Sequence, residues 1–141
     1  MPTRQRVLFV CLHNSARSQM AEGMLRAWAD DRFEVHSAGT EARGLRPEAI
    51  VVMAEIGIDI GAQQSKTIER FIGESWDHLI TVCDESVEAC PHVPGAAATE
   101  HWQFPDPSAV AGEETARLAA FRAVRDEIAS AIHDFVKRAG G

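Results

Sequence analysis

The sequence contains no tyrosine, only three cysteines and no long apolar run. A membrane-spanning helix needs about 20 consecutive apolar residues, and no segment approaches that length. The apolar run Val7–Leu12 is also too short to be the hydrophobic region of a secretory signal peptide. Three cysteines without such a signal indicate a reducing compartment and thiol chemistry rather than a framework of structural disulfides. We therefore expect a cytoplasmic protein without a membrane partner.

Basic residues are also in deficit, because Lys and Arg number 14 against 21 Asp and Glu, which gives a net charge of −7. No basic face is evident, and this argues against a nucleic-acid partner. Any anion must be bound by local dipoles and single cations, since the overall field repels it. The 141 residues contain no internal repeat, low-complexity tract or linker, so we expect one domain over residues 1–141.

Segments of strand and helix character alternate along the chain. Strands are predicted at Val7–Cys11, Phe33–His36, Leu79–Val82 and Thr99–Phe104, and helices at 18–30, 47–56, 65–71 and 112–137. The alternation predicts a three-layer α/β fold, in which helices cover both faces of a four-stranded parallel sheet. Such sheets bind ligands at the carboxyl ends of their strands, where Cys11, Cys83 and Asp106 are expected.

Two of the predicted helices have a clear apolar face that we expect in the core. The first helix has Met20, Met24, Leu25 and Trp28 on one side. The last helix has an apolar face made of Leu118, Phe121, Val124, Ile128, Ile132 and Phe135. Pro47 suits the first turn of the second helix, and Gly57 is expected to cap its end.

The most informative segment follows the first strand, where Cys11 and Arg17 bracket five residues. The pattern places a thiol beneath the amino end of a helix, where backbone N–H groups and the helix dipole hold anions. This field favours the thiolate, and Arg17 offers a planar fork of donors to oxyanion oxygens. Asn14 tolerates the left-handed dihedrals of a tight loop, while Ser18 can cap the helix and donate to the Cys11 sulfur.

These features predict a phosphate-binding loop after strand 1, with Cys11 as a nucleophile at its floor. The predicted oxyanion-binding residues are Leu12, His13, Asn14, Ser15, Ala16, Arg17 and Ser18. A buried core cysteine followed by a solvated arginine is the alternative, and the strand–loop–helix context argues against it.

The other two cysteines, Cys83 and Cys90, are separated by six residues. On one straight helix their sulfurs would share a face but lie ~10 Å apart. A disulfide needs Cα atoms within ~7 Å, so a direct bond requires this segment to unwind or loop out. Two alternatives stay open: a core Cys83 with an unrelated Cys90, and a zinc site that uses both cysteines and His92.

Asp106 lies between Pro105 and Pro107, in a rigid extended turn. A rigidly held carboxyl group beside a nucleophile suits a general acid, although an Asp-Pro turn is also common loop chemistry. Four other histidines lack a partner pattern, and we expect solvated or core roles for them: His36, His78, His101 and His133.

With these residues in view, the chain resembles the thioredoxin-coupled arsenate reductases, which have the low-molecular-weight protein tyrosine phosphatase fold. The likeness spans nearly the whole chain. It is carried by residues 11–23, Ser37-Ala38-Gly39, the Cys83 and Cys90 pair, and residues 100–107. The loop is typical of the wider superfamily, whereas the two distal thiols indicate the reductases within it.

The resemblance implies roles for the site residues. Cys11 would attack arsenate held by the loop amides and Arg17, while Asp106 protonates the departing oxygen. Cys83 would then attack the Cys11 sulfur and release arsenite. Cys90 would move the disulfide to a Cys83–Cys90 pair that thioredoxin reduces. Phosphate and sulfate would compete with arsenate, no metal or cofactor is expected, and the protein is expected to be a monomer.

The sequence departs from the superfamily at two positions. Many of its loops carry Gly where His13 stands, and His13 could tune the loop. In some relatives an Asp contributes to a potassium site at the position of Lys66, where a fixed ammonium would replace the ion.

A tyrosine phosphatase is the main competing function, because it shares Cys11, Arg17 and Asp106. A phosphatase has no need of the two distal thiols, and such enzymes commonly place tyrosines after the Asp-Pro, where this chain has Ser108-Ala109-Val110. A thiol-based sensor is a non-enzymatic alternative, but no DNA-binding pattern supports it.

Overall fold

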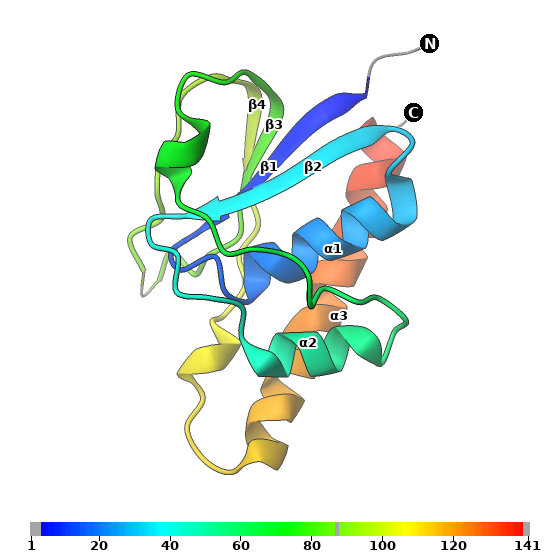
Figure 1. Cartoon of the computed structure of the whole chain (residues 1–141), viewed down its shortest axis with the longest axis vertical. Coiled ribbons are helices and arrows are strands. Elements are labelled where there is room, and N and C mark those ends of the chain that lie inside the picture. The colour runs from blue at the N-terminus through cyan, green and yellow to red at the C-terminus, as the bar shows by residue number, and fades with distance from the viewer. Residues whose placement is uncertain (1–3, 87, 140–141) are drawn as a thin grey trace.

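The computed structural model describes residues 4–86 and 88–139. Four parallel strands form one sheet with the order β2-β1-β3-β4 (Figure 1). The strands are β1 (Gln5–Cys11), β2 (Phe33–Gly39), β3 (Trp76–Thr81) and β4 (Ala96–His101). The helices are α1 (Arg17–Ala29), α2 (Pro47–Ala54), α3 (Glu114–Ala139) and two one-turn 3-10 helices, η1 (Ile68–Phe71) and η2 (Pro107–Ala109). The predicted four-stranded parallel α/β fold is confirmed.

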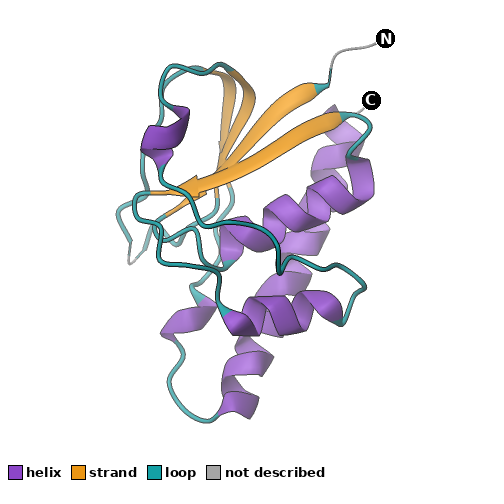
Figure 2. Ribbon diagram, viewed as in Figure 1, coloured by secondary structure: helices purple, strands orange, loops and turns teal. Residues whose placement is uncertain are grey.

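The two faces of the sheet are covered unequally (Figure 2). Val7, Phe9 and Cys11 of β1 belong to a large apolar cluster that includes residues of α1, α2 and α3. Leu8 and Val10 belong to a smaller cluster that includes Phe71 of η1. Both faces of β1 are therefore buried, and this agrees with its unbroken apolar sequence.

The strand order places the functional region at a topological switch point. β1 pairs with β2 on one side and with β3 on the other, so the chain reverses direction across the sheet at β1. The N–H of Val82 donates to the carbonyl of Val10 at 2.9 Å. Because Cys11 follows Val10 and Cys83 follows Val82, both cysteines reach the carboxyl edge of the sheet on neighbouring segments.

Strand β4 is displaced by three residues from its predicted position. The strand was predicted at Thr99–Phe104, whereas it covers Ala96–His101. Trp102 and Phe104 pack instead against the large cluster as the chain crosses toward α3. Consecutive alanines have little strand propensity, and pairing with β3 decides the register here.

The three α-helices lie close to their predicted positions, whereas the helix predicted at 65–71 is only the 3-10 turn η1 at Ile68–Phe71. α2 ends at Ala54, and Gly57 follows it with φ of +80°, while the N–H of Ile58 reaches back to Met53. The apolar face of α3 is buried as predicted except at Leu118, which is half-buried, and Trp28 of α1 is 37% exposed. Trp28 stacks on His133 of α3 at 4.4 Å between ring centroids, so the core-face prediction was wrong for this residue.

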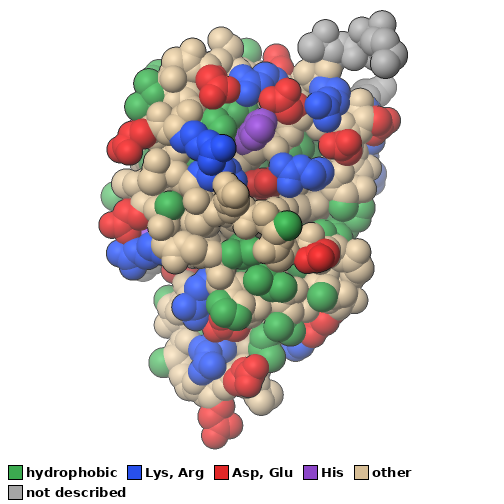
Figure 3. Space-filling view, in the orientation of Figure 1, with side chains coloured by type: hydrophobic (Ala, Val, Ile, Leu, Met, Phe, Trp, Pro, Cys, Tyr) green, Lys and Arg blue, Asp and Glu red, His purple; other side chains and the backbone are tan. Residues whose placement is uncertain are grey.

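Acidic and basic side chains are interspersed on the face shown in Figure 3. No helix within the described residues combines the length and hydrophobicity needed to cross a membrane.

Candidate active site

The loop between β1 and α1 is held from outside by main-chain hydrogen bonds. The carbonyls of Cys11, Leu12, His13 and Ser15 accept from the N–H groups of Thr40, Glu41, Arg43 and Arg46, respectively. In a planar trans peptide the N–H points opposite to the carbonyl. The N–H groups of residues 12, 13, 14 and 16 are therefore directed toward the inside of the loop, as an anion cradle requires.

Asn14 holds the middle of this loop in shape. Its φ of +48° is the only positive value at a non-glycine residue among those described, so the predicted left-handed conformation is confirmed. The fully buried side chain donates to Ser18 at 2.8 Å and Ser37 at 2.9 Å. Its carbonyl oxygen accepts from the main chain of Lys66 at 2.7 Å and from Gln19 at 2.9 Å. Every side-chain polar atom of Asn14 is thus satisfied, which fixes the strained backbone.

Cys11 is 2% exposed as a residue, and its sulfur lies on the floor of the loop. It is 2.9 Å from the Ser18 hydroxyl and 3.3 Å from the N–H of Asn14. These groups and the amino end of α1 place hydrogen-bond donors and partial positive charge around the sulfur. Ser18 contacts Cys11 as predicted, but it does not cap the helix, because α1 begins at Arg17 after Ala16 and has no side-chain cap.

Gly39, at the end of β2, lies directly against the loop. A Cβ atom there would lie 2.7 Å from the Asn14 nitrogen and 2.8 Å from the Leu12 oxygen, both of them backbone atoms. Such contacts require the loop to move, because neither atom belongs to a flexible side chain. The absence of a side chain at residue 39 is therefore a geometric requirement of the cradle.

We expect the substitution Gly39→Ala to weaken binding of inorganic phosphate by about tenfold or more, since displaced amides no longer converge on the anion. Titration calorimetry would measure this affinity. Gly61→Ala is a matched control, because its Cβ would contact only the Asp59 side chain, at 3.1 Å. Equal phosphate affinity in the two variants would contradict the requirement for glycine at residue 39.

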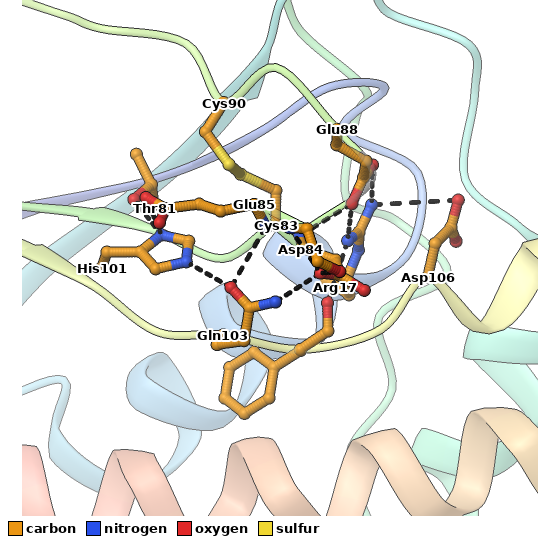
Figure 4. Close-up of a disulfide and its surroundings, with 12 residues drawn as sticks. Arg17, Thr81, Cys83, Asp84, Glu85, Glu88, Cys90, His101, Gln103 and Asp106 are labelled. Atoms are coloured by element: carbon orange, nitrogen blue, oxygen red, sulfur yellow. Dashed lines mark hydrogen bonds and ion pairs between the residues drawn. A yellow bond between two sulfur atoms is a disulfide. The ribbon is translucent and has the colours of Figure 1, made fainter.

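Arg17 is 3% exposed at the first turn of α1, where it donates to the carbonyl of Phe104 at 3.2 Å, and its other partners are acidic. Its two terminal nitrogens donate to both oxygens of Glu88, at 2.6 and 2.8 Å. Asp106 lies 3.8 Å from Nη2 (Figure 4). Burial opposes the charged guanidinium, but the hydrogen bonds to Glu88 and the charges of Cys11 and Asp106 raise the pKa of Arg17.

Glu88 was not singled out from the sequence. It lies in Asp84-Glu85-Ser86-Val87-Glu88, a stretch that has the composition of a solvated acidic loop. Nothing in the pattern distinguishes the carboxylate that pairs with Arg17 from its exposed neighbours. Only the path of the chain between the two cysteines brings it to the loop.

Asp106 is held as the proline-flanked turn predicts. Its Oδ1 accepts from the N–H of Ser108 at 2.9 Å and from the Ser108 hydroxyl at 2.6 Å, which leaves Oδ2 toward Arg17. Asp106 and Ser108 line a cavity of about 400 Å³ together with His13, Arg43 and Arg46. The carboxyl group therefore stands at the entrance to the loop, in a position suited to proton transfer.

Cys83 and Cys90 form a disulfide, with their Cα atoms 6.1 Å apart, and Cys11 is the free cysteine. The described residues between them form turns and no helix, so the segment is looped out, as a direct bond requires. Cys83 is fully buried, whereas Cys90 is half-buried.

The zinc alternative named the wrong histidine. His101, not His92, has a ring nitrogen grouped with the two sulfurs within 4.8 Å. In the disulfide form neither sulfur is available as a thiolate ligand. His101 bonds to Thr81 at 2.7 Å and to Gln103 at 2.9 Å, which gives this residue hydrogen-bond partners that the sequence pattern did not indicate.

Lys66 lies behind the loop. Its ammonium is 3.5 Å from Glu22 and donates to the carbonyl of Gln64 at 2.6 Å, and burial lowers its pKa. Glu22 in turn accepts from Ser37, which bonds to Asn14. A fixed cation thus stands beside the loop network, and this arrangement does not fit an added potassium ion at the same place.

The site brings together the free thiol of Cys11, the guanidinium of Arg17, the carboxyl group of Asp106 and two further cysteines, Cys83 and Cys90, which are joined in a disulfide. The first three suit attack on a tetrahedral oxyanion. The two further thiols allow the sulfur of a reaction intermediate to be attacked in turn.

Comparison with known proteins gives a consistent result. The family model of the low molecular weight phosphotyrosine protein phosphatases matches residues 6–140. An arsenate reductase of Bacillus subtilis is 41% identical over 131 residues, which cover 93% of this chain and 94% of that protein.

Two solved structures extend the comparison. An arsenate reductase in a phosphate-binding state has a TM-score of 0.81 at 34% identity, covering 95% of this chain and 98% of the other. A thioredoxin-dependent arsenate reductase of Corynebacterium glutamicum has a TM-score of 0.69 at 27% identity and covers 96% of this chain and 61% of the other.

Proposed function

Since the chain belongs to the low molecular weight phosphotyrosine protein phosphatase family and to the arsenate reductases within it, we propose that it reduces arsenate to arsenite through three cysteines. Cys11 is the nucleophile, Cys83 and Cys90 carry the disulfide onward, and thioredoxin is the final reductant.

The Cys83–Cys90 disulfide is the observation that carries this proposal. It lies at the same edge of the sheet as Cys11, on the segment that follows the neighbouring strand. Phosphate ester hydrolysis needs one thiolate and one acid and gives no role to two further thiols. Reduction of As(V) to As(III) needs two electrons, and a pair of thiols supplies them by forming a disulfide.

The first step is thiolate attack on the bound oxyanion. The Cys11 sulfur forms a bond to arsenic, and one oxygen leaves as water after Asp106 supplies a proton. Arg17 and the inward N–H groups of residues 12, 13, 14 and 16 stabilise the negative charge on the remaining oxygens. The Ser18 hydroxyl and the N–H of Asn14 contact the sulfur before attack.

The next two steps are thiol–disulfide chemistry. The Cys83 thiolate attacks the Cys11 sulfur, the electron pair of the sulfur–arsenic bond moves to arsenic, and arsenite leaves. The Cys90 thiolate then attacks Cys83, which forms the Cys83–Cys90 bond and returns Cys11 as a thiolate. The structure corresponds to the state after this transfer.

Thioredoxin is proposed to attack at Cys90, because this sulfur is half-buried whereas Cys83 is fully buried. Accessibility of the attacked sulfur governs such exchange. We place the protein in the cytoplasm, where thioredoxin keeps thiols reduced, and as a monomer, because one chain supplies all residues of the relay.

The test is NADPH oxidation in the presence of arsenate, thioredoxin and thioredoxin reductase. We expect one NADPH to be consumed per arsenite formed, with no turnover when thioredoxin is omitted. Turnover that needs glutathione or mycothiol instead would contradict the proposed reductant. Efficient hydrolysis of aryl phosphates without any arsenate reduction would favour the phosphatase function.

A further inference from the structure

The carboxylate of Glu88 is hydrogen-bonded to the guanidinium of Arg17, the group that the proposed function uses to bind the oxyanion. The Glu88 side chain is only 10% exposed and binds both terminal nitrogens of Arg17 (Figure 4). Hydrogen bonds from Arg17 lower the pKa of Glu88 and keep it charged. A carboxylate with two oxygens on the two nitrogens has the geometry with which arginine also binds oxyanions.

Glu88 is also part of the turn that closes the disulfide. Its N–H donates to the carbonyl of Asp84 at 2.8 Å, and its Oε1 accepts from the N–H of Asp84 at 2.7 Å. This turn lies between Cys83 and Cys90, whose Cα atoms are 6.1 Å apart in the disulfide. The same side chain therefore joins the closed turn to Arg17.

The electrostatic consequence is a neutralised oxyanion site. Arg17 faces two carboxylates, Glu88 and Asp106, together with the free thiol of Cys11. Because this site is buried and poorly screened by water, a carboxylate in it strongly repels a neighbouring anion. An incoming dianion must overcome this repulsion whichever edge of the guanidinium it uses.

We propose that Glu88 is a positioning residue that couples the Cys83–Cys90 redox state to the oxyanion site. In the disulfide form Glu88 neutralises Arg17 and keeps the turn closed, so oxyanions bind weakly. Reduction frees the turn, withdraws the carboxylate and makes Arg17 available for the next substrate. This inference rests on the proposed function, since it gives Glu88 a place in the same relay.

Within the relay Glu88 acts after arsenite has left. When the product departs, Arg17 loses its bound oxyanion, and the carboxylate of Glu88 takes the place of that oxyanion. Closing of the turn brings Cys90 to Cys83 for the transfer already described, so no bond is made or broken beyond that step. Because Glu88 replaces the oxyanion at Arg17, the site does not bind a new oxyanion before the Cys83–Cys90 disulfide is reduced.

Such coupling must be reciprocal. If the disulfide weakens phosphate binding, phosphate must destabilise the disulfide by the same factor. A side chain that only maintained the fold would not produce this pair of matching effects. Inorganic phosphate is a suitable probe because it resembles arsenate but is not reduced.

The first measurement is phosphate affinity by titration calorimetry, on the protein with the disulfide formed and on the fully reduced protein. We expect the wild type to bind phosphate about tenfold more weakly in the disulfide form, within the usual range of coupling between sites. Glu88→Gln should bind phosphate equally in both forms, to within about twofold, through tighter binding by the disulfide form. Unchanged affinity of the reduced variant shows that it is folded.

Glu85→Gln is the matched control. It makes the same change of charge in the same turn, at a side chain that is 63% exposed. We expect this variant to keep the wild-type difference between the two redox forms. Weaker phosphate binding by both forms of Glu88→Gln would overturn the proposal and make Glu88 a support for Arg17. Identical behaviour of the two variants would overturn it as well.

The second measurement is the redox equilibrium of the Cys83–Cys90 pair in glutathione buffers, followed by thiol counting. Saturating phosphate should shift the wild-type equilibrium about tenfold toward the dithiol, which is ~30 mV for this two-electron couple. The shift should be absent in Glu88→Gln, and a shift equal to that of the wild type would overturn the proposal. Because neither measurement uses arsenate, they succeed or fail independently of the reductase assay.

Discussion

Replacing Cys90 by serine is expected to stop thioredoxin-driven reduction after one arsenite per protein molecule. Without this thiol the Cys11–Cys83 disulfide has no internal partner and accumulates, since a hydroxyl does not attack a disulfide. The nucleophile, Arg17 and Asp106 are unchanged, so hydrolysis of an aryl phosphate should continue within about twofold of the wild-type rate. The two assays, with mass spectrometry of the trapped disulfide, measure this outcome.

A matched variant separates the two distal thiols. Cys83→Ser should block the step before, so arsenite should not be released, while aryl phosphate hydrolysis is again retained. Normal repeated turnover of Cys90→Ser with thioredoxin would show that the relay ends at Cys83. A small thiol would then be the better candidate for the reductant.

The second large effect is expected for Cys11→Ser, which should lower both arsenate reduction and aryl phosphate hydrolysis by at least ~10⁴-fold. A serine hydroxyl is not ionised in this loop and cannot supply electrons to arsenic. Steady-state rates with both substrates measure the loss.

The same variant should still bind phosphate, and more tightly than the wild type. The loop amides and Arg17 are intact, and a neutral hydroxyl replaces a thiolate that repels the dianion. Calorimetry with the reduced proteins provides the comparison. Loss of phosphate binding in Cys11→Ser would mean that the loop is misfolded without the sulfur, and residual reductase activity would remove Cys11 from its role as nucleophile.

Local patterns predicted the loop well, because its requirements are local. A β-branched strand, a tolerant Asn14 and a helix after Arg17 sit within a few residues of one another, and each has a steric or electrostatic reason to be there. The parallel sheet followed from the alternation of elements, whereas its strand order, β2-β1-β3-β4, was not predicted. Boundaries were less accurate, as at β4, where pairing with β3 outweighs the weak propensity of alanine.

The support of the loop could not be predicted in the same way. Gly39, Glu88 and the segment 40–46 are distant in sequence from Cys11, and each matters through a contact that exists only after folding. The requirement for glycine at residue 39 becomes visible only in the fold, where an added Cβ would lie 2.7 Å from the Asn14 nitrogen. Glu88 has the same sequence character as its acidic neighbours, and only the folded turn between Cys83 and Cys90 places it against Arg17.

The segment from Thr40 to Arg46 holds the loop mainly by main-chain donors, and the Glu41 side chain adds a contact to His13 at 3.9 Å. The shape of the oxyanion-binding loop therefore depends little on which side chains this segment carries, provided that its N–H groups stay in place. The entrance cavity and the oxyanion-binding loop can thus change independently of each other. Side chains such as Arg43 can be exchanged to alter which molecules enter, while the chemistry below is preserved.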